Sequence, residues 1–159
     1  MNNAKLRIIN YDPHYARRLH EIFTDAVHAI PDEMYSVAQK QAWAPRHAHD
    51  AQWCHRLELK QPFIALASER AVGFIELEAN GHIDCLYVAP KSQRQGVASR
   101  LYTHLQNVAR ARQQTRLFVE ASKAAKPFFE KRGFVLKRAN KIFRLGETLT
   151  NYSLEKKLP

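Results

Sequence analysis

Apolar positions divide the first third of the chain into one strand followed by three helices. Residues 5–9 alternate between polar and apolar side chains, as a half-buried strand does. Between residues 13–30 the apolar side chains recur at the three-to-four spacing of a helical stripe, directly after an Asp-Pro pair that is typical of a helix start. Two shorter helices are expected at 35–43 and 49–59.

The rest of the chain is richer in strands. Short apolar runs bounded by turn residues predict further strands, and an Asn-Gly pair at 80–81 predicts a hairpin. A long amphipathic helix is expected from residue 96 to about 113, and a short one over 124–131, before a glycine typical of a helix end. The strands are expected at 63–67, 72–77, 83–88, 117–119, 135–145 and 151–158.

This order of elements predicts a mixed α/β (α+β) fold, because helices are available to cover both faces of one sheet. The chain has 159 residues, of which 45% are apolar and 25% charged, a balance that allows a sizeable core. No repeat, low-complexity tract or linker interrupts it. We therefore expect residues 1–159 to form a single domain.

The sequence argues against several classes of protein. It has no apolar run of about 18 residues that could span a membrane, and its N-terminus lacks the apolar region of a signal peptide. Cys54 and Cys85 are isolated, and the histidines lack the spacing of a metal site. We expect no metal, a cytoplasmic location, and Cys85 as a small core residue on a strand.

Charge is distributed unevenly between the two halves. Residues 1–88 contain 9 Lys and Arg against 11 Asp and Glu, a net charge of −2. Residues 89–159 contain 16 against 4, a net charge of +12. The second half is therefore expected to attract anions, for which a nucleic acid, an acidic surface or a polyphosphate cofactor are candidates.

Gly96 lies where a predicted strand ends and the long helix begins. The amides at a helix N-terminus lack intrahelical partners, so a glycine turn leading into such an end can bind an anion. The motifs of kinase-type phosphate loops and of dinucleotide-binding turns are both absent. The turn alone leaves open whether Gly96 serves an anion or only starts the helix.

Two blocks of sequence resemble the GNAT acetyltransferase superfamily. Residues 93–98, Gln-Arg-Gln-Gly-Val-Ala, match its Gln/Arg-x-x-Gly-x-Gly/Ala signature. Residues 120–134 resemble its downstream Asn-x-x-Ala-x-x-x-Tyr-x-x-x-Gly-Phe block. Residues 35–45, 81–84 and 149–152 are also similar to a bacterial branch of the family often labelled YafP-like.

The resemblance implies the GNAT fold, a mixed sheet of about six to seven strands whose central parallel strands splay apart. It also implies acetyl-CoA as co-substrate, with the pyrophosphate on the amides of residues 95–99 and the pantetheine arm along residues 86–88. The cofactor-binding residues carried over in this way are Leu86, Tyr87, Val88, Gln93, Arg94, Gln95, Gly96, Val97, Ala98, Ser99, Ser122 and Phe129.

The chain departs from the family pattern at two of these positions. Ser122 stands where the family has asparagine, and it keeps the capacity for a hydrogen bond. Phe129 stands where many relatives have the tyrosine proposed to protonate the departing thiolate. Phe129 cannot do so, which leaves another residue, water or an unassisted thiolate for that step.

The first candidates for a catalytic base are His82 and Asp84, which alternate on one predicted strand and so share a face. His82 corresponds to a position where some GNAT members carry a catalytic carboxylate, and an imidazole titrates near neutral pH. Asp84 would orient His82 or hold a cationic substrate. The alternative for His82 is a solvent-exposed hairpin end.

Three further side chains are candidates for catalysis. Glu76 on the preceding strand is expected to face the gap as base or amine anchor, whereas Glu78 suits a solvated sheet face. Glu120 ends the next strand beside the gap, where it could instead only cap the following helix. Tyr152 in the closing hairpin could supply the missing hydroxyl or only pack.

The resemblance makes an enzyme that acetylates a primary amine of a small molecule the favoured function, by direct attack in a ternary complex. Tyr35 and Trp43 would line the acceptor site, although an aromatic core patch is an alternative for Trp43. A peptide or protein acceptor, or a CoA-binding sensor without turnover, remain open. Nucleic-acid binding is disfavoured because its usual motifs are missing. Homodimerisation is left open.

Overall fold

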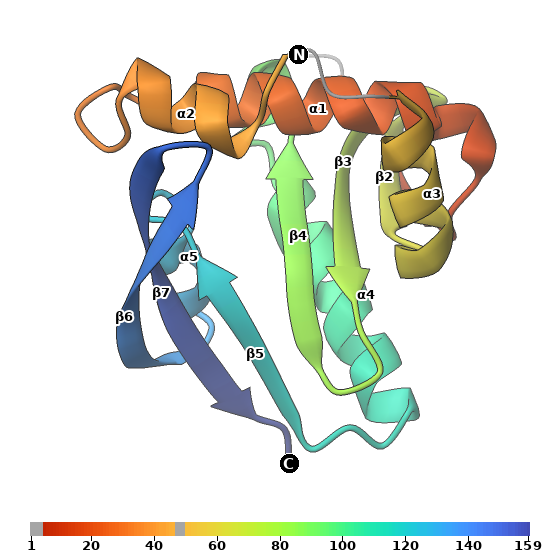
Figure 1. Cartoon of the computed structure of the whole chain (residues 1–159). Coiled ribbons are helices and arrows are strands. Elements are labelled where there is room, and N and C mark those ends of the chain that lie inside the picture. Colours follow the sequence, from red (N-terminus) through yellow and green to blue (C-terminus); the bar gives the residue numbers. More distant parts are fainter. Residues whose placement is uncertain (1–4, 47–49) are drawn as a thin grey trace.

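A seven-stranded mixed sheet crosses the molecule in the order β1-β2-β3-β4-β5-β7-β6 (Figure 1). The computed structural model describes residues 5–46 and 50–159. Neighbouring strands are antiparallel except β4 and β5, which run parallel. The strands are β1 (Leu6–Ile9), β2 (Phe63–Ala67), β3 (Arg70–Leu77), β4 (His82–Val88), β5 (Arg116–Ala121), β6 (Val135–Arg144) and β7 (Glu147–Lys157).

Helices cover both faces of this sheet and bury two apolar clusters. Leu101 and Leu105 of α4 pack with the strands on one face. Leu19 of α1 and Leu57 of α3 belong to the cluster on the other face. In Figure 1, α1 and α2 lie across one end of β4 and α4 runs behind the sheet. The helices are α1 (Ala16–His28), α2 (Val37–Trp43), α3 (Asp50–Lys60), α4 (Val97–Ala111) and α5 (Lys126–Glu130).

The parallel strands β4 and β5 diverge along their length. Over these two fully described strands the pairing is limited to His82 with Phe118 and Ile83 with Val119. β4 stays paired with β3 as far as Val88, and β5 stays paired with β7 as far as Ala121. A V-shaped opening therefore separates the later halves of β4 and β5, as Figure 1 shows. The splayed sheet expected from the resemblance is confirmed.

Most predicted elements are present, with shifted ends. Asp12 does accept a hydrogen bond from the His14 amide (2.9 Å), but the first turn is a 3-10 turn and α1 follows it. Tyr35 precedes α2, because Ser36 caps that helix in a reciprocal capping box. The start predicted for the third helix, His49, lies outside the described residues. No helix of the described chain is long and apolar enough to cross a membrane.

The closing hairpin is tighter than its sequence suggested. β7 begins at Glu147, so a two-residue turn of Leu145 and Gly146 joins it to β6. Both turn residues have positive φ, 47° and 82°, as a type I′ hairpin turn requires. Leu145 is an unfavourable residue for that conformation, which is why the sequence did not reveal the turn.

Candidate active site

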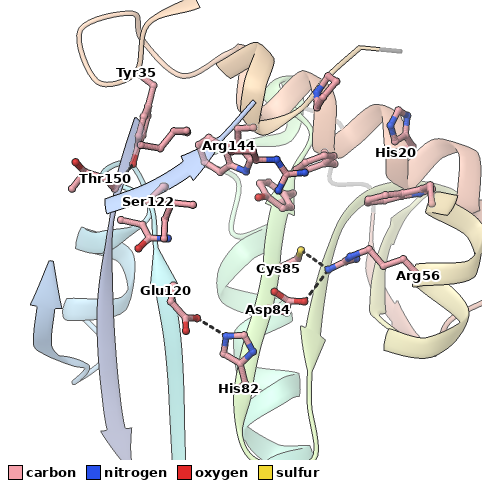
Figure 2. Close-up of a pocket in the computed structure, with 18 of the residues that line it drawn as sticks. His20, Tyr35, Arg56, His82, Asp84, Cys85, Glu120, Ser122, Arg144 and Thr150 are labelled. Atoms are coloured by element: carbon pink, nitrogen blue, oxygen red, sulfur yellow. Dashed lines mark hydrogen bonds and ion pairs between the residues drawn. The ribbon is translucent and has the colours of Figure 1, made fainter. Parts of the chain in front are cut away.

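A cavity of about 800 Å³ lies between the helices α1–α3, strand β4 and the β6–β7 hairpin (Figure 2). A second cavity, of about 60 Å³, occupies the opening between β4 and β5, where Leu86, Val119 and Phe129 line it. The two cavities share wall residues, so the larger one adjoins the opening. The shared residues are Trp43, Asp84, Cys85, Tyr87, Glu120 and Ser122.

The glycine turn before α4 has the geometry of an anion site. Gly96 caps the helix with φ of 83°, a conformation that side chains other than glycine rarely adopt. A Cβ added there would meet no described atom within 4 Å, so the space above it is open. The Arg100 amide donates to the Gly96 carbonyl (3.0 Å). The amides of residues 97–99 therefore have no intrahelical acceptor.

Side chains around this turn brace it. Gln93 Nε2 donates to the Val88 carbonyl (3.0 Å), and Gln95 Nε2 donates to the Lys91 carbonyl (3.0 Å). These amide groups fix the loop, so the backbone is left as the main binding surface. Ser99 Oγ accepts a hydrogen bond from Arg132 (2.6 Å), which adds a positive charge that the sequence analysis did not identify.

His82 lies between two carboxylates on the floor of the larger cavity. Its Nδ1 is 2.7 Å from Glu78 Oε1, and its Nε2 is hydrogen-bonded to Glu120 Oε2. The ring stacks on Phe118 with centroids 4.9 Å apart. Burial lowers the pKa of His82, but the hydrogen bonds to both carboxylates outweigh it, so its pKa is raised above the ordinary 6.5. His82 is thus not a loose hairpin end.

Asp84 points into the same cavity but is held by two cations. Lys60 lies 2.9 Å from its carboxylate and Arg56 lies 3.0 Å away. Burial raises the pKa of Asp84, yet the two cations overcome this and the pKa is lowered. Lys60 also contacts Glu78 (3.1 Å), so it links Asp84 to the partner of His82. Asp84 is an ionised, paired group and a poor proton acceptor.

The structure does not place Glu76 at the gap. Its side chain is fully buried and both oxygens are bonded to Arg56, at 2.5 and 2.7 Å. Burial raises the pKa of Glu76 even though Arg56 opposes the shift. Arg56 lines the cavity, whereas Glu76 lies behind it. The expectation that Glu76 faces the gap is therefore corrected: it anchors Arg56.

Neither Tyr152 nor Phe129 presents a hydroxyl to the cavity. Asn151 and Leu149 line the cavity, but Tyr152 does not; its ring lies 5.4 Å from Lys126 Nζ of α5. The expected hydroxyl from Tyr152 is thus not directed at the cavity. Phe129 is 1% exposed, packs in an aromatic group with Phe134, and lines the small cavity.

Ser122 and the aromatic residues complete the walls. Ser122 Oγ accepts from the Ala125 amide (3.1 Å) at the entry to α5. Tyr35 is 1% exposed, and its hydroxyl donates to the Thr150 carbonyl (2.6 Å) and accepts from the Lys123 amide (2.9 Å). Tyr35 therefore contributes a ring to the wall and no free hydroxyl, while Trp43 lies against it at 5.4 Å.

The cations of α3 were not predicted from the sequence. His82 and Asp84 share one face of β4, next to Glu76 of β3 and to Glu78, which directly follows that strand. α3 covers this face with two basic residues four apart, Arg56 and Lys60. That spacing places both on one side of a helix, so it was a usable signal. The aromatic wall residues Phe23 and Trp53, whose rings stack 5.5 Å apart, had no comparable signal.

Comparisons with known proteins agree with this fold. Residues 31–156 match the family model of the acetyltransferase (GNAT) domain. The chain is 34% identical to the uncharacterised N-acetyltransferase YafP of Escherichia coli K12, over 99% of this chain and 98% of that protein. A GCN5-related N-acetyltransferase from Rhodopseudomonas palustris is 34% identical, with a TM-score of 0.92 over 99% of each chain.

More distant structures share the architecture. PaiA N-acetyltransferase from Thermoplasma acidophilum, solved with coenzyme A, has a TM-score of 0.78 at 15% identity, over 97% of this chain and 99% of its own. The acetyltransferase YncA from Salmonella typhimurium, solved with acetyl-CoA, has a TM-score of 0.73 at 17% identity, over 99% and 95%. On the family model and the two relatives at 34% identity, the chain belongs to the GNAT acetyltransferase family.

Proposed function

We propose that the protein transfers the acetyl group of acetyl-CoA to a primary amine of a small molecule, by direct attack in a ternary complex. The observation that carries this proposal is the position of His82 and Glu120. They lie on the floor of an 800 Å³ cavity that adjoins the opening between β4 and β5. A cavity of this volume suits a small molecule.

Acetyl-CoA fits the residues on the other side of the opening. The free amides of 97–99 and the open space above Gly96 suit its pyrophosphate. The backbone of β4 at residues 86–88, unpaired on the β5 side, suits the pantetheine amides. The coenzyme A and acetyl-CoA of the PaiA and YncA structures support this assignment. The cofactor supplies an acetyl group activated as a thioester.

The chain's own task is to bring the amine to that carbonyl and to remove a proton. As the new nitrogen–carbon bond forms and the carbon–sulfur bond breaks, the amine loses one proton and the thiolate leaves. Glu120 lies at the cavity wall and is bonded to His82, so the pair can take the proton directly or through water. Glu78 then stabilises the imidazolium from the other side.

Protonation of the departing thiolate lacks an obvious donor. Phe129 carries no acidic group, and Tyr152 lies off the cavity. The proton held by His82 is the nearest titratable source, and a thiolate is itself a stable leaving group close to neutral pH. The proposed cycle therefore needs one proton acceptor, His82 with Glu120, and no tyrosine.

Thiol release from acetyl-CoA across a panel of primary amines tests the proposal, with the acetylated product identified by mass spectrometry. His82→Gln should lower kcat by about 100-fold or more, the usual contribution of a general base, and leave the affinity for acetyl-CoA nearly unchanged. Glu58→Gln, an exposed charge change on α3, serves as the control. Full activity of His82→Gln across the pH range would place the base elsewhere.

A further inference from the structure

The β6–β7 hairpin brings a basic side chain into the cavity. Ile142 and Arg144 are two apart on β6, share a face, and both line the cavity. In Figure 2, Arg144 reaches across the end of the cavity near α1, whereas His82 and Glu120 lie at the opposite end. The tight turn that follows Arg144 makes it the last residue of the strand.

Hydrogen bonds to the segment around α2 hold this hairpin in place. Gln39 Nε2 donates to the Thr148 carbonyl (2.8 Å), and the Tyr35 hydroxyl donates to the Thr150 carbonyl (2.6 Å). Both acceptors are on β7, within a few residues of the turn. Because these bonds fix β7, and β6 is paired with β7 as far as Arg144 opposite Glu147, the backbone of Arg144 has a defined position above the cavity.

Some of the cationic side chains around the cavity form ion pairs with carboxylates, and one does not. Arg56 is bonded to Glu76 and Asp84, and Lys60 to Glu78 and Asp84. Arg144 forms no ion pair with any residue in the described chain. Glu147 lies opposite it across the turn but beyond ion-pair distance. The guanidinium is therefore available to a ligand.

The charge of the cavity is consequently divided between its ends. At the His82 end, Asp84, Glu120 and Arg56 line the cavity, and Glu76, Glu78 and Lys60 lie behind them, so four carboxylates face two paired cations there. The Arg144 end carries one unpaired positive charge. Aromatic rings also line the cavity, among them the stacked Phe23 and Trp53. A ligand complementary to this cavity is positive at one end and negative at the other, with an apolar part that packs on the rings.

We propose that the acceptor is an amine that also carries a carboxylate, which Arg144 binds while the amine lies at His82 and Glu120. A guanidinium holds a carboxylate through two parallel hydrogen bonds, so it fixes the orientation as well as the charge of the ligand. Arg144 would then determine specificity without taking part in proton transfer. This inference rests on the proposed amine acetylation.

The test compares acceptors that differ only in the anionic group. 4-(Aminomethyl)benzoate and 4-(aminomethyl)benzamide have nearly equal amine basicity, because the ring separates the two groups. A longer pair, the corresponding phenylpropanoate and its amide, allows for the length of the cavity. The measured quantity is the ratio of kcat/KM for acid over amide, in the wild type, Arg144→Gln, Arg144→Lys and Lys141→Gln.

We expect the wild type to prefer the acid of at least one pair. Arg144→Gln should reduce that preference about tenfold, mainly through a higher KM for the acid, because it removes one charged pair in a partly exposed site. Arg144→Lys should restore part of it. Lys141→Gln removes the same charge from the same strand, at a residue that does not line the cavity, and should leave the ratio unchanged.

Three outcomes would overturn the inference. Equal turnover of acid and amide in the wild type, unaffected at Arg144, would refute carboxylate recognition while leaving amine acetylation intact. An equal loss in Lys141→Gln and Arg144→Gln would indicate general electrostatic attraction instead of a site. If none of these amines releases thiol from acetyl-CoA while other primary amines of the panel do, this inference fails and the proposed function stands; if no primary amine does, both fail.

Discussion

Replacing either carboxylate that contacts His82 should shift the pH at which the enzyme gains activity. His82 must be neutral to accept a proton, and both neighbours stabilise its charged form. Glu78→Gln and Glu120→Gln each exchange a negative charge for a neutral amide of similar shape. The pKa of His82 should therefore fall in both variants, and the acidic limb of kcat/KM should move to lower pH.

The size of the shift follows from contact distance and exposure. A carboxylate at hydrogen-bonding distance shifts a neighbouring pKa by about 1–3 units. The side chains are 17% exposed for His82, 35% for Glu78 and 43% for Glu120, so water screens both pairs. We therefore expect about 1 unit for each substitution, the low end of that range.

Two assays measure this shift independently. NMR titration of the His82 ring, assigned by its absence in His82→Gln, gives the pKa without substrate. The pH profile of kcat/KM, recorded with one amine for all variants, gives the kinetic value. The amine's own ionisation is common to all profiles, so their differences belong to the enzyme. Glu58→Gln, on the exposed side of α3, is the matched control.

A His82 pKa that stays within about 0.3 units of the wild-type value in both variants, well below the expected shift, would contradict the stabilisation of the imidazolium by the two carboxylates. A shift in the NMR titration without a matching shift in the kinetic profile would be a different result. It would keep the electrostatic account of His82 but remove His82 from the proton-transfer step.

Three further outcomes follow from the same contacts. Arg56→Met should destabilise the fold by about 3–5 kcal/mol in urea unfolding, because it leaves Glu76 buried without a partner; Arg56→Met with Glu76→Met should recover most of this loss. Phe129→Tyr should leave kcat nearly unchanged, since the proposed cycle needs no tyrosine even though residue 129 lines the small cavity; a clear rise in kcat would mean that a proton donor is lacking. The free energy of unfolding that His82 contributes through its charged form should be fully present below pH about 6.5 and be lost as the pH rises through its raised pKa. The difference in unfolding free energy between wild type and His82→Gln should therefore disappear above that pKa.

The order of elements was predictable because each has a strong local signal. Alternation, helical spacing and the Asn-Gly and Asp-Pro pairs are properties of a few neighbouring residues. The ends of the closing hairpin were predicted less accurately, because Leu145 adopts a left-handed backbone conformation that leucine disfavours. Contacts from Gln39 and Tyr35 to β7 hold the strands instead, and no local pattern encodes them.

The candidate site was only partly predictable for a similar reason. His82 and Asp84 were found because they lie on the strand that leads to the signature turn, and Glu120 because it ends the next strand beside the gap. The charged residue that each of them contacts depends on which helix covers that face of the sheet, and helix packing is a property of the tertiary structure. α3 brings Arg56 to Glu76, which turns an expected base into a buried anchor. The position of Arg144 depends in turn on the packing of the hairpin against α2.

Calorimetric titration with acetyl-CoA tests the central claim, that the turn before α4 holds the acetyl-CoA of an acetyl-transfer site. Gly96→Asp and Gly146→Asp are a matched pair, because both glycines have φ near 82° and open space around an added Cβ. The account predicts a one-to-one complex for wild type and Gly146→Asp, and no binding for Gly96→Asp, whose carboxylate would repel the pyrophosphate. Unchanged binding by Gly96→Asp, or no binding by the wild type, would contradict it.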